Sequence, residues 1–521
     1  MADRAQPAEP WRRSLFDALL AAAKAHGAKK PILEDQERRP LAYLDLIRAS
    51  FALGRKLASM TAKGERVGIM LPSSAGASVT FFALQAFGRV PAMLNFTAGI
   101  RNLKAAQSLA GIRLVLTSHR FVEQGKLHDQ IDALEGASRI VYLEDVRRQI
   151  GLRDRLYALA TSAAPMRFRA PIDPDDPAVI LFTSGSFGAP RGVALSHANI
   201  LSNVDQVARH IALDPAWVMF NPLPVFHCFG LTGGLMLPLI CGLKAFQYPS
   251  PLHFKLIPPL LKETGASVLL ATDTFVSQYA RSAEPGALSG LEFIVCGAER
   301  VREETHALIA ERFGRVPVLE GYGATETSPV IAVNKPNDNR PGTVGGILPG
   351  IQTRIDPVDG ILRGGRLSVR GPNVMLGYLS EGGGIEAPDG GWHDTGDVVE
   401  MTNDGWITIL GRVKRFAKIG GEMVSLTAAE ELVAQIWPGS RHAVVALPDH
   451  RKGEKLVLVT EQTDVDLPRL LAHARKIGAS ELAAPRRIVW IAETPVLGSG
   501  KIDYVAIQRM AEADERANVS R

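Results

Sequence analysis

Residues 179–193 have the sequence Val-Ile-Leu-Phe-Thr-Ser-Gly-Ser-Phe-Gly-Ala-Pro-Arg-Gly-Val, and the rest of the pattern is organised around them. The apolar start, residues 179–182, is typical of a buried strand. The loop that follows is rich in glycine and hydroxyl residues, reaches the cation Arg191, and leads to a helix-like segment from Ser196. Glycines let backbone N–H groups face an anion, hydroxyls add donors, and arginine adds charge. The stretch predicts a phosphate-binding loop, although an isolated loop of this kind is more often an ordinary turn.

The composition limits the classes of protein to which the chain can belong. Its 521 residues predict two or more domains, and an apolar content of 46% with a charged content of 22% is typical of a globular protein. The net charge of +5 is small, and no basic cluster stands out in about the first four hundred residues, so no nucleic-acid partner is expected. The cysteines have neither disulfide nor metal spacing, which favours a reducing, cytoplasmic location; they are Cys228, Cys241 and Cys296.

The order of helical and apolar stretches predicts layered domains. Residues 1–10 are polar and rich in proline and alanine, which predicts disorder. From there to about residue 170, helix-like stretches alternate with short apolar runs, which predicts α/β layers around a mainly parallel sheet. The last hundred or so residues form a second, compact strand–helix alternation. We therefore expect an α/β fold with a large domain over residues 11–411, a small α+β domain over 415–510 and a tail over 511–521.

A second glycine-bounded loop lies at residues 319–327, with the sequence Leu-Glu-Gly-Tyr-Gly-Ala-Thr-Glu-Thr. Tyr322 can stack on a purine, Thr325 can bind a phosphoryl oxygen, and Glu326 can hold Mg2+. A tight turn around a buried tyrosine explains the same residues equally well. The loop alone therefore does not distinguish a nucleotide site from a turn, and the other motifs are needed to interpret it.

Three further residues carry weaker patterns. His227 has the chemistry of a functional group, but a lone histidine is more often satisfied in a core. Asp397 lies at a predicted strand end and suits the two hydroxyls of a ribose. Lys501 lies on a glycine loop that is not a Walker motif, because Pro495 and Ile502 stand where that motif needs glycine and Ser or Thr.

With these motifs in this order, the chain resembles the adenylate-forming superfamily, which comprises acyl-CoA synthetases, peptide-synthetase adenylation domains and luciferases. The resemblance covers about residues 170–505. The runs at 248–253, 319–323, 340–345 and 414–425 are similar to the acyl-ACP synthetase portion of the bifunctional 2-acylglycerophosphoethanolamine acyltransferase/acyl-ACP synthetases. Of the activities of these bifunctional proteins, the resemblance implies only the synthetase activity for this chain.

The resemblance implies a large domain of layered sheets and helices, a small mobile C-terminal domain, and a ligase reaction in two steps. A fatty carboxylate, expected to be long-chain, attacks the α-phosphorus of ATP in the presence of Mg2+ and gives acyl-adenylate and pyrophosphate. A phosphopantetheine thiol then attacks the adenylate and gives a thioester and AMP. The branch implies acyl carrier protein (ACP) as the acceptor. CoA is the alternative acceptor, and a non-catalytic nucleotide-binding relative is a remote alternative.

The resemblance also implies a role for each motif residue. Catalysis is expected of Arg191, Thr325, Glu326 and Lys501, with Glu326 also holding Mg2+. The nucleotide is expected to contact Thr183, Ser184, Gly185, Ser186, Gly188, Gly297, Ala298, Glu299, Gly321, Tyr322, Gly323, Asp397 and Arg412. The hinge at residues 412–414 and the pantetheine path are expected to use Lys414, Lys418, Gly420 and Gly421. The acyl channel is expected to be lined by Phe226, His227, Thr272 and Phe275, with room left by Gly297 and Gly323.

Two residues of the predicted phosphate loop depart from the family pattern that the resemblance implies. Arg191 stands in place of the usual lysine of the phosphate loop, and Phe187 in place of a small or polar residue at its tip.

The basic residues within 412–418 and 451–455 offer a docking surface for acidic ACP or for CoA phosphates, although a solvated charged surface explains them nearly as well. The resemblance also implies a fatty acid partner, collected through peripheral contact with the inner membrane face.

Overall fold

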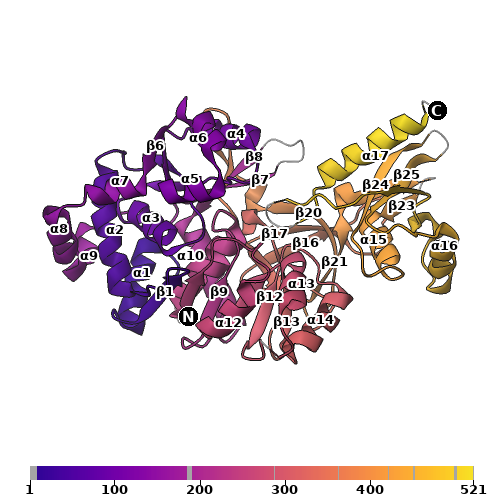
Figure 1. Cartoon of the computed structure of the whole chain (residues 1–521), viewed down its shortest axis with the longest axis horizontal. Helices are drawn as coiled ribbons and strands as arrows, with labels where there is room; N and C mark the ends of the chain where they lie inside the picture. The colour runs from indigo at the N-terminus through magenta and orange to yellow at the C-terminus, as the bar shows by residue number, and fades with distance from the viewer. Residues whose placement is uncertain are drawn as a thin grey trace, which may run out of the picture. The chain divides into compact units, whose positions relative to one another are not determined.

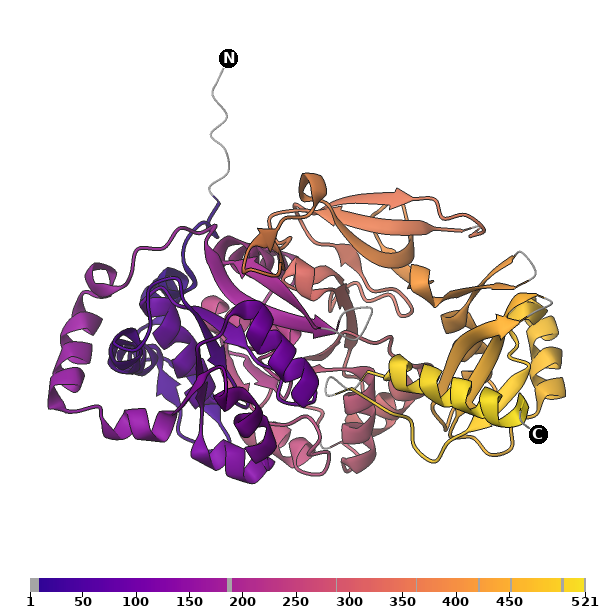
Figure 2. The same ribbon diagram turned by 90° about the horizontal axis from the view of Figure 1, so that it is seen from above.

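The structure of the chain is a computed structural model that describes residues 9–184, 190–286, 288–361, 363–419, 422–449, 452–497 and 501–519. The chain divides into two compact units (Figures 1 and 2). Unit 1 comprises Met1–Arg340, Ile347–Ile351 and Arg370–His393, and unit 2 comprises Pro341–Gly346, Gln352–Val369 and Asp394–Arg521. Most of the predicted disordered stretch, residues 1–8, lies outside the described residues.

A nine-stranded sheet in unit 1 carries most of the loops that form the candidate site. Its spatial order is β15 (Gly346–Ile347), β14 (Val330–Val333), β13 (Val318–Gly323), β12 (Phe293–Cys296), β11 (Val268–Ala271), β9 (Val218–Asn221), β10 (Lys244–Gln247), β1 (Pro31–Asp35) and β2 (Leu41–Ala42). The strands from β13 to β1 in this order run parallel, and β14 and β2 pair antiparallel with their neighbours. Central strands such as β11 are continuous apolar runs, as expected for strands that are buried on both faces.

An eight-stranded sheet contains the stretch on which the sequence pattern is centred. Its spatial order is β19 (Ile385–Glu386), β18 (Gly377–Leu379), β8 (Pro190–Ser196), β7 (Pro177–Ser184), β4 (Val90–Met93), β3 (Arg66–Ile69), β5 (Leu114–Thr117) and β6 (Arg139–Tyr142). The strands from β7 to β6 run parallel, which confirms the predicted mainly parallel α/β layers. β8 turns back antiparallel on β7, because the apolar residues 193–195 continue as a buried strand before the predicted helix begins.

Helices connect the strands of unit 1. They are α1 (Leu15–His26), α2 (Tyr43–Ala58), α3 (Ala75–Ala86), α4 (Ile100–Ala110), α5 (His119–Gly125), α6 (His128–Glu135), α7 (Leu143–Arg148), α8 (Leu152–Ala163), α9 (Pro165–Phe168), α10 (His197–His210), a π-helix (Phe229–Met236), α11 (Leu237–Cys241), α12 (Ile257–Thr264), α13 (Asp273–Ser282) and α14 (Glu303–Phe313). α10 is the helix predicted from Ser196. It begins with a capping box, in which Ser196 Oγ accepts from Asn199 N at 3.0 Å and Asn199 Oδ1 accepts from Ser196 N at 2.9 Å.

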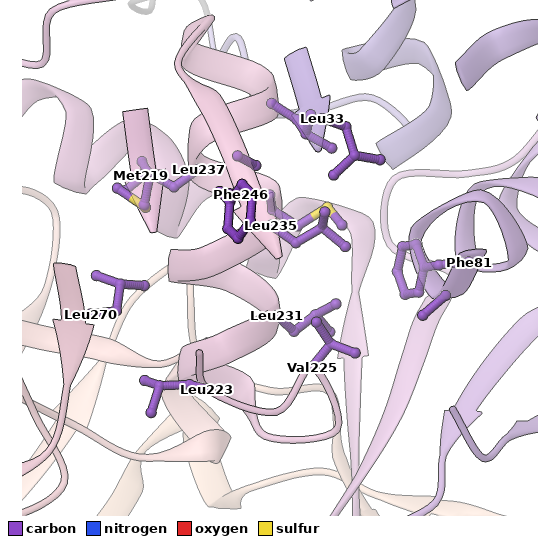
Figure 3. Packing of buried hydrophobic residues seen from close by; sticks show 14 of the residues in the cluster. Leu33, Phe81, Met219, Leu223, Val225, Leu231, Leu235, Leu237, Phe246 and Leu270 are labelled. Carbon is purple, nitrogen blue, oxygen red and sulfur yellow. The ribbon is translucent and has the colours of Figure 1, made fainter. Parts of the chain in front are cut away.

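The largest apolar core of unit 1 packs the nine-stranded sheet against the π-helix and the N-terminal helices. Figure 3 shows Leu231, Leu235 and Phe246 near the centre of this cluster, with Leu270 and Phe81 towards its two sides. All five side chains are buried. This core fixes the strands whose carboxyl ends carry the candidate site.

Unit 2 contains two smaller sheets. One has the order β16 (Gln352–Asp356), β17 (Gly365–Arg370), β20 (His393–Met401) and β21 (Ile407–Arg412). The other has the order β23 (Glu422–Ser425), β22 (Phe416–Ile419), β25 (Gly453–Thr460) and β24 (His442–Asp449), with β26 (Arg487–Trp490) also paired to β25. The helices of unit 2 are α15 (Leu426–Ala434), α16 (Leu467–Lys476) and α17 (Tyr504–Val519). The predicted junction and hinge at 411–414 concern motion, and they stay predictions.

The second sheet of unit 2 has an apolar cluster on each face. Val444 faces one cluster with residues of α15 and α16, whereas Val445 faces the other with Ile507 and Ala511 of α17. The alternation of neighbouring residues between the two clusters is the two-residue period of a strand. α17 therefore packs on the sheet, and it includes most of the segment predicted as a tail.

Among the helices that the structure describes, none combines the length and the apolar character that crossing a bilayer requires.

Candidate active site

Several predicted site residues follow neighbouring parallel strands of the nine-stranded sheet. β9, β11, β12 and β13 end at Asn221, Ala271, Cys296 and Gly323, and they are adjacent in the order β13-β12-β11-β9. The carboxyl ends of parallel strands meet at one edge of the sheet, which is where open α/β sheets bind ligands. The strand order therefore brings together the loops that contain Phe226 and His227, Thr272, Gly297 to Glu299, and Tyr322 to Glu326.

The loop after β12 is anchored by carboxylates from helix α13 and strand β13 on its two sides. Arg302 donates from its backbone N and from Nε to the two oxygens of Asp273, at 3.1 and 2.6 Å. Val301 N donates to Glu320 Oε2 at 3.1 Å, and Asp273 and Glu320 are both buried. The predicted nucleotide residue Glu299 accepts from Thr274 N at 3.1 Å through Oε2. The sequence pattern assigned no role to the carboxylates of Asp273 and Glu320, since their function appears only in the hydrogen bonds.

The loop from Gly321 to Glu326 turns back sharply into β14. A side chain at Gly323 would place its Cβ 1.8 Å from the carbonyl oxygen of Pro329, so this close approach of two backbones requires glycine. This close approach explains the glycine by itself, and the expected room for an acyl chain at Gly323 stays a prediction. Tyr322 is buried in β13, while Thr325 and Glu326 are partly exposed in a short 3-10 turn.

Tyr378 of β18 joins two predicted site residues. Its hydroxyl donates to Glu326 Oε1 at 2.7 Å, and the guanidinium carbon of Arg191 lies 3.3 Å from the centroid of its ring. Arg191 pairs with Thr183 in the β7–β8 ladder, and Tyr378 pairs with Val193 in the β8–β18 ladder. We refer to Arg191, Tyr378 and Glu326 as the cation–carboxylate cluster. No sequence pattern pointed to Tyr378, because β18 is short and has no motif around it.

The tip of the predicted phosphate loop is not among the described residues. Gly185, Ser186, Phe187 and Gly188 lie outside them, and so do Gly420 and Gly421 of the predicted pantetheine path. The structure describes the two strands that hold the ends of the phosphate loop, with the Ser184 backbone opposite Pro190.

A small apolar cavity of about 50 Å³ lies beneath the carboxyl edge of the sheet. It is enclosed by residues of α10, the π-helix, β9, β11, β12 and β14, and Phe229 lines it. Gly297, at the strand end above, has its missing Cβ 3.2 Å from the ring of Phe229. None of the four residues predicted to line the acyl channel lines this cavity: Phe226, His227, Thr272 and Phe275.

Two of these predicted channel residues make structural contacts, and their role in a channel stays a prediction. Thr272 caps α13, since its Oγ1 accepts from Phe275 N at 3.4 Å, and Phe275 is buried in the main core. Phe226 is buried and packs edge-to-face on Phe96, with 4.9 Å between ring centroids. His227 is half-buried beside Phe226.

The cysteines are free, and burial makes them poor nucleophiles. Burial raises the pKa of Cys241 to about 12. Burial also raises the pKa of Cys228 to about 12, with a contribution from the negative charge of Glu326. The pKa of Cys296 is raised well above its usual value by the same cause. Protonated thiols are poor nucleophiles towards an acyl group, so none of the three cysteines is a candidate for covalent catalysis.

In the part of the chain that the structure describes, no group of three or more His, Cys, Asp or Glu could hold a metal ion. Mg2+ does not need such a group, because it is commonly held by one or two carboxylates together with the phosphates of a substrate. Glu326 fits this role: it is partly exposed, and Tyr378 orients one of its two oxygens.

The predicted ribose residues meet in unit 2. Asp397 and Arg412 pair across β20 and β21, and Arg412 Nε donates to Asp397 Oδ1 at 2.7 Å. Asp397 is buried, whereas Arg412 is largely exposed. The structure thus brings together the two residues that the resemblance assigned to one group.

The lysines expected to act in unit 2 lie on its surface or at turns. Lys414 is in a 3-10 turn (Val413–Arg415), and Lys418 is exposed on β22. Lys501 is exposed just before α17, and its carbonyl oxygen accepts from Leu497 N at 2.7 Å.

Part of the predicted docking surface is not available to a partner. Arg415 is largely buried and pairs with Glu430 at 2.6 Å, and Lys455 pairs with Glu515 at 2.6 Å. These two cations stabilise unit 2 internally. Arg451 lies outside the described residues.

Comparison with known proteins identifies a matching family, related sequences and similar solved structures. The model of the family described as "AMP-binding enzyme" matches residues 19–379. The medium-chain fatty-acid–CoA ligase of Escherichia coli K12 is 28% identical over 354 residues, which are 64% of this chain and 61% of that protein. The long-chain-fatty-acid–CoA ligase of Yersinia pestis is 27% identical over 485 residues, 84% of each chain. Among solved structures, ATP-bound MatB from Rhodopseudomonas palustris matches with a TM-score of 0.81 at 25% identity, over 96% of this chain and 98% of that one.

Proposed function

Because the chain belongs to the AMP-binding enzyme family, we propose that it is an AMP-forming acid–thiol ligase that activates a fatty acid with ATP and transfers the acyl group to the phosphopantetheine thiol of ACP. The observation that carries the proposal is the cation–carboxylate cluster, in which one tyrosine holds a guanidinium suited to phosphate and a carboxylate suited to Mg2+. A fatty acid as the substrate is supported by the names of the medium-chain and long-chain relatives.

In the first half-reaction, a carboxylate oxygen of the fatty acid attacks the α-phosphorus of ATP, and the bond from that phosphorus to the pyrophosphate oxygen breaks. When bound, Mg2+ would neutralise phosphate charge at Glu326. Arg191 binds phosphate oxygens, and Thr325 donates to the α-phosphate. These residues position the reactants and stabilise charge, and none forms a covalent bond.

In the second half-reaction, the thiol sulfur attacks the acyl carbon of the adenylate. The bond to the AMP oxygen breaks, AMP leaves, and the thiol proton is released. Asp397 and Arg412 would hold the ribose, and Lys501 would contact the carboxylate and the α-phosphate during the first half-reaction only. By the resemblance, rotation of the small domain about Lys414 exchanges Lys501 for the pantetheine segment.

CoA is the second candidate acceptor, because the fatty-acid relatives are CoA ligases. The proposal for ACP is supported by the similarity of residues 248–253, 319–323, 340–345 and 414–425 to acyl-ACP synthetases. The proposal includes a cytoplasmic location, which the free thiols support, and peripheral contact with a membrane where fatty acids partition.

Fatty-acid-dependent exchange of labelled pyrophosphate into ATP tests the first half-reaction. We expect exchange with palmitate and Mg2+, and none without acid. A purified, folded protein that catalyses no exchange with any fatty acid would contradict the ligase assignment.

A second assay chooses the acceptor. Palmitate, ATP and equal concentrations of holo-ACP or CoA are supplied separately, and the thioester is measured. A higher kcat/KM with holo-ACP is expected, and a higher kcat/KM with CoA would assign the chain to the acyl-CoA ligases instead.

A further inference from the structure

A stripe of large apolar side chains lies exposed along α8 in unit 1. Leu152, Leu156 and Leu159 are 73%, 55% and 52% exposed. Their spacing of four and three residues places them on one face of the helix. Single exposed leucines are common, but three in a continuous stripe form a patch that calls for a partner.

The distribution of residues on α8 is the reverse of that of an ordinary surface helix. The face that packs against the body of unit 1 carries Asp154, Ala158 and Thr161, all of which are buried. Asp154 is held there by Lys56 of α2, whose Nζ lies 3.0 Å from its Oδ2. The small and polar residues therefore attach the helix, and the leucines face away from the core.

α9 extends the same apolar surface. Met166 and Phe168 are 55% and 45% exposed, and the Phe168 ring packs edge-to-face on Tyr157 of α8 at 6.3 Å between centroids. Both helices lie at one edge of unit 1, where α8 packs beside α2 (Figures 1 and 2). We name Leu152, Leu156, Leu159, Met166 and Phe168 the apolar patch.

Three exposed arginines flank the apolar patch. Residues 147–169 contain six arginines and one acidic residue, the buried Asp154, and two of the six, Arg148 and Arg169, pair with Asp145 and Asp17. On α8, Arg153 and Arg155 flank the leucine stripe on its two sides, since they follow Leu152 by about 100° and 300° of helical rotation. Arg167 is exposed between the two apolar residues of α9. Among the described residues, no acidic side chain pairs with the flanking cations Arg153, Arg155 and Arg167.

We propose that α8 and α9 form a docking surface for an anionic lipid bilayer. A helix with one apolar stripe and flanking arginines lies in the interface of a membrane, where the stripe enters the acyl region and the guanidinium groups bind lipid phosphates. A second copy of the chain fits less well, because a two-fold contact through this patch would bring the arginines of both copies together. The proposal rests on the membrane contact included in the proposed function and assigns it a surface, but it is independent of the ligase chemistry, since none of these residues belongs to the candidate active site.

Vesicle sedimentation tests the proposal with the full-length protein and no ATP or fatty acid. We expect the protein to pellet with vesicles of phosphatidylcholine and phosphatidylglycerol, and to bind phosphatidylcholine alone more weakly. The triple variant L152S/L156S/L159S should lower the partition coefficient on anionic vesicles by roughly tenfold or more. The triple variant R153Q/R155Q/R167Q should lower it by roughly a hundredfold and remove most of its salt dependence.

The matched control is L252S/L256S. These two leucines are 59% and 56% exposed elsewhere on unit 1, so their replacement changes exposed apolar area without touching the patch. The control should bind vesicles like the wild type, and all variants should keep the wild-type melting temperature because the changed side chains are exposed.

Three results would overturn the proposal. They are no binding to anionic vesicles, unchanged binding of both triple variants, and a lipid-free dimer in analytical ultracentrifugation that L152S/L156S/L159S abolishes. The last result would make the patch an interface between copies. Capture of an acidic protein by the patch without vesicle binding would likewise assign it to a protein partner. Because no step of the assay uses the active site, failure here leaves the proposed ligase function untouched.

Discussion

At the scale of single residues, Tyr378 positions both Arg191, the proposed phosphate-binding cation, and Glu326, the proposed Mg2+-binding carboxylate. Its ring supports the guanidinium of Arg191 and its hydroxyl holds Glu326. This arrangement also gives a physical reason for arginine at the position where the resemblance leads us to expect lysine. A planar guanidinium stacks on an aromatic face, whereas a compact ammonium gains less from that geometry.

Tyr378→Phe should separate the function of the Tyr378 ring from that of its hydroxyl. The variant keeps the stack under Arg191 but removes the hydrogen bond to Glu326, which leaves the carboxylate free to rotate. We expect kcat/KM for pyrophosphate exchange to fall about tenfold. The Mg2+ concentration that gives half of the maximal exchange rate should be higher than for the wild type. Steady-state exchange at varied Mg2+ measures both quantities.

Tyr142→Phe is the control for this variant, because Tyr142 stacks on His119 with 3.7 Å between ring centroids and lies away from the cluster. A Tyr378→Phe enzyme with wild-type Mg2+ dependence would show that the hydroxyl does not position Glu326.

The motif residues could be predicted one at a time, but their contacts could not. Arg191 and Glu326 were recognised from a cation and a carboxylate in glycine loops, while Tyr378, which joins them, lies about fifty residues further along in a strand with no motif. The sequence does not predict that Phe275 is buried in the main core, because an aromatic beside a strand end has the same local pattern in a core and in a pocket. Burial, which depends on the tertiary fold, distinguishes the two.

At the scale of elements, the parallel strands β11, β12 and β13 act together through the loops at their carboxyl ends. The loop after β12, with Ala298 in the left-handed region at φ 70°, is fixed by hydrogen bonds to Asp273 of α13 and Glu320 of β13. A non-glycine residue in that conformation costs energy, which the surrounding bonds offset.

Asp273→Asn should loosen this loop. A neutral amide weakens the charge-assisted bonds to Arg302, at a cost of roughly 1–3 kcal/mol. We expect a lower melting temperature and a KM for ATP raised several-fold, with a smaller effect on kcat. Thermal melting and exchange kinetics measure these changes.

Asp338→Asn provides the matched control, since Asp338 pairs with Arg340 on the surface, where both side chains are well exposed. Surface pairs contribute little, so this variant should melt and react like the wild type. An Asp273→Asn enzyme with lower stability but an unchanged KM for ATP would limit Asp273 to a structural role.

The contact of α1 with α10 carries a predicted sensitivity to acid. His197 Nδ1 accepts from Leu15 N at 3.0 Å, and burial lowers the pKa of His197 to about 4. In the unfolded chain His197 takes up a proton below about pH 6.5, whereas in the folded chain it does so only near pH 4. The free energy of unfolding therefore falls as the pH drops from about 6.5 towards 4. The loss amounts to at most about 3 kcal/mol.

His197→Gln tests this link, because the glutamine side chain offers an acceptor oxygen but does not titrate. Urea unfolding at a series of pH values should show a flatter acid limb for the variant than for the wild type. Parallel acid limbs would mean that other groups cause the acid sensitivity.

At the scale of the whole molecule, the α/β class and the mainly parallel layers were predictable because strand and helix periodicity are local properties of the sequence. The antiparallel hairpin β7–β8 was not, since residues 193–195 show no strand pattern distinct from the helix that follows. The arginine-rich segment around α8 was overlooked because its charges are spread over more than twenty residues. Only the folded helices show that they surround a patch.

Lys501→Ala should divide the two half-reactions. We expect the variant to lose fatty-acid-dependent pyrophosphate exchange by about a thousandfold, because no other cation is proposed to bridge the carboxylate and the α-phosphate. Thioester formation from synthetic acyl-adenylate should stay close to the wild-type rate. Equal loss of both half-reactions would contradict a role confined to the first.

The chemistry of the native thiols makes the proposed domain rotation measurable. Burial raises the pKa of all three cysteines and so disfavours the thiolate that attacks a maleimide, and we expect them to be labelled slowly at neutral pH. Single cysteines introduced at exposed sites on the two units can then carry a donor and an acceptor fluorophore without removal of any native residue. Energy transfer between the dyes would follow each turnover in real time.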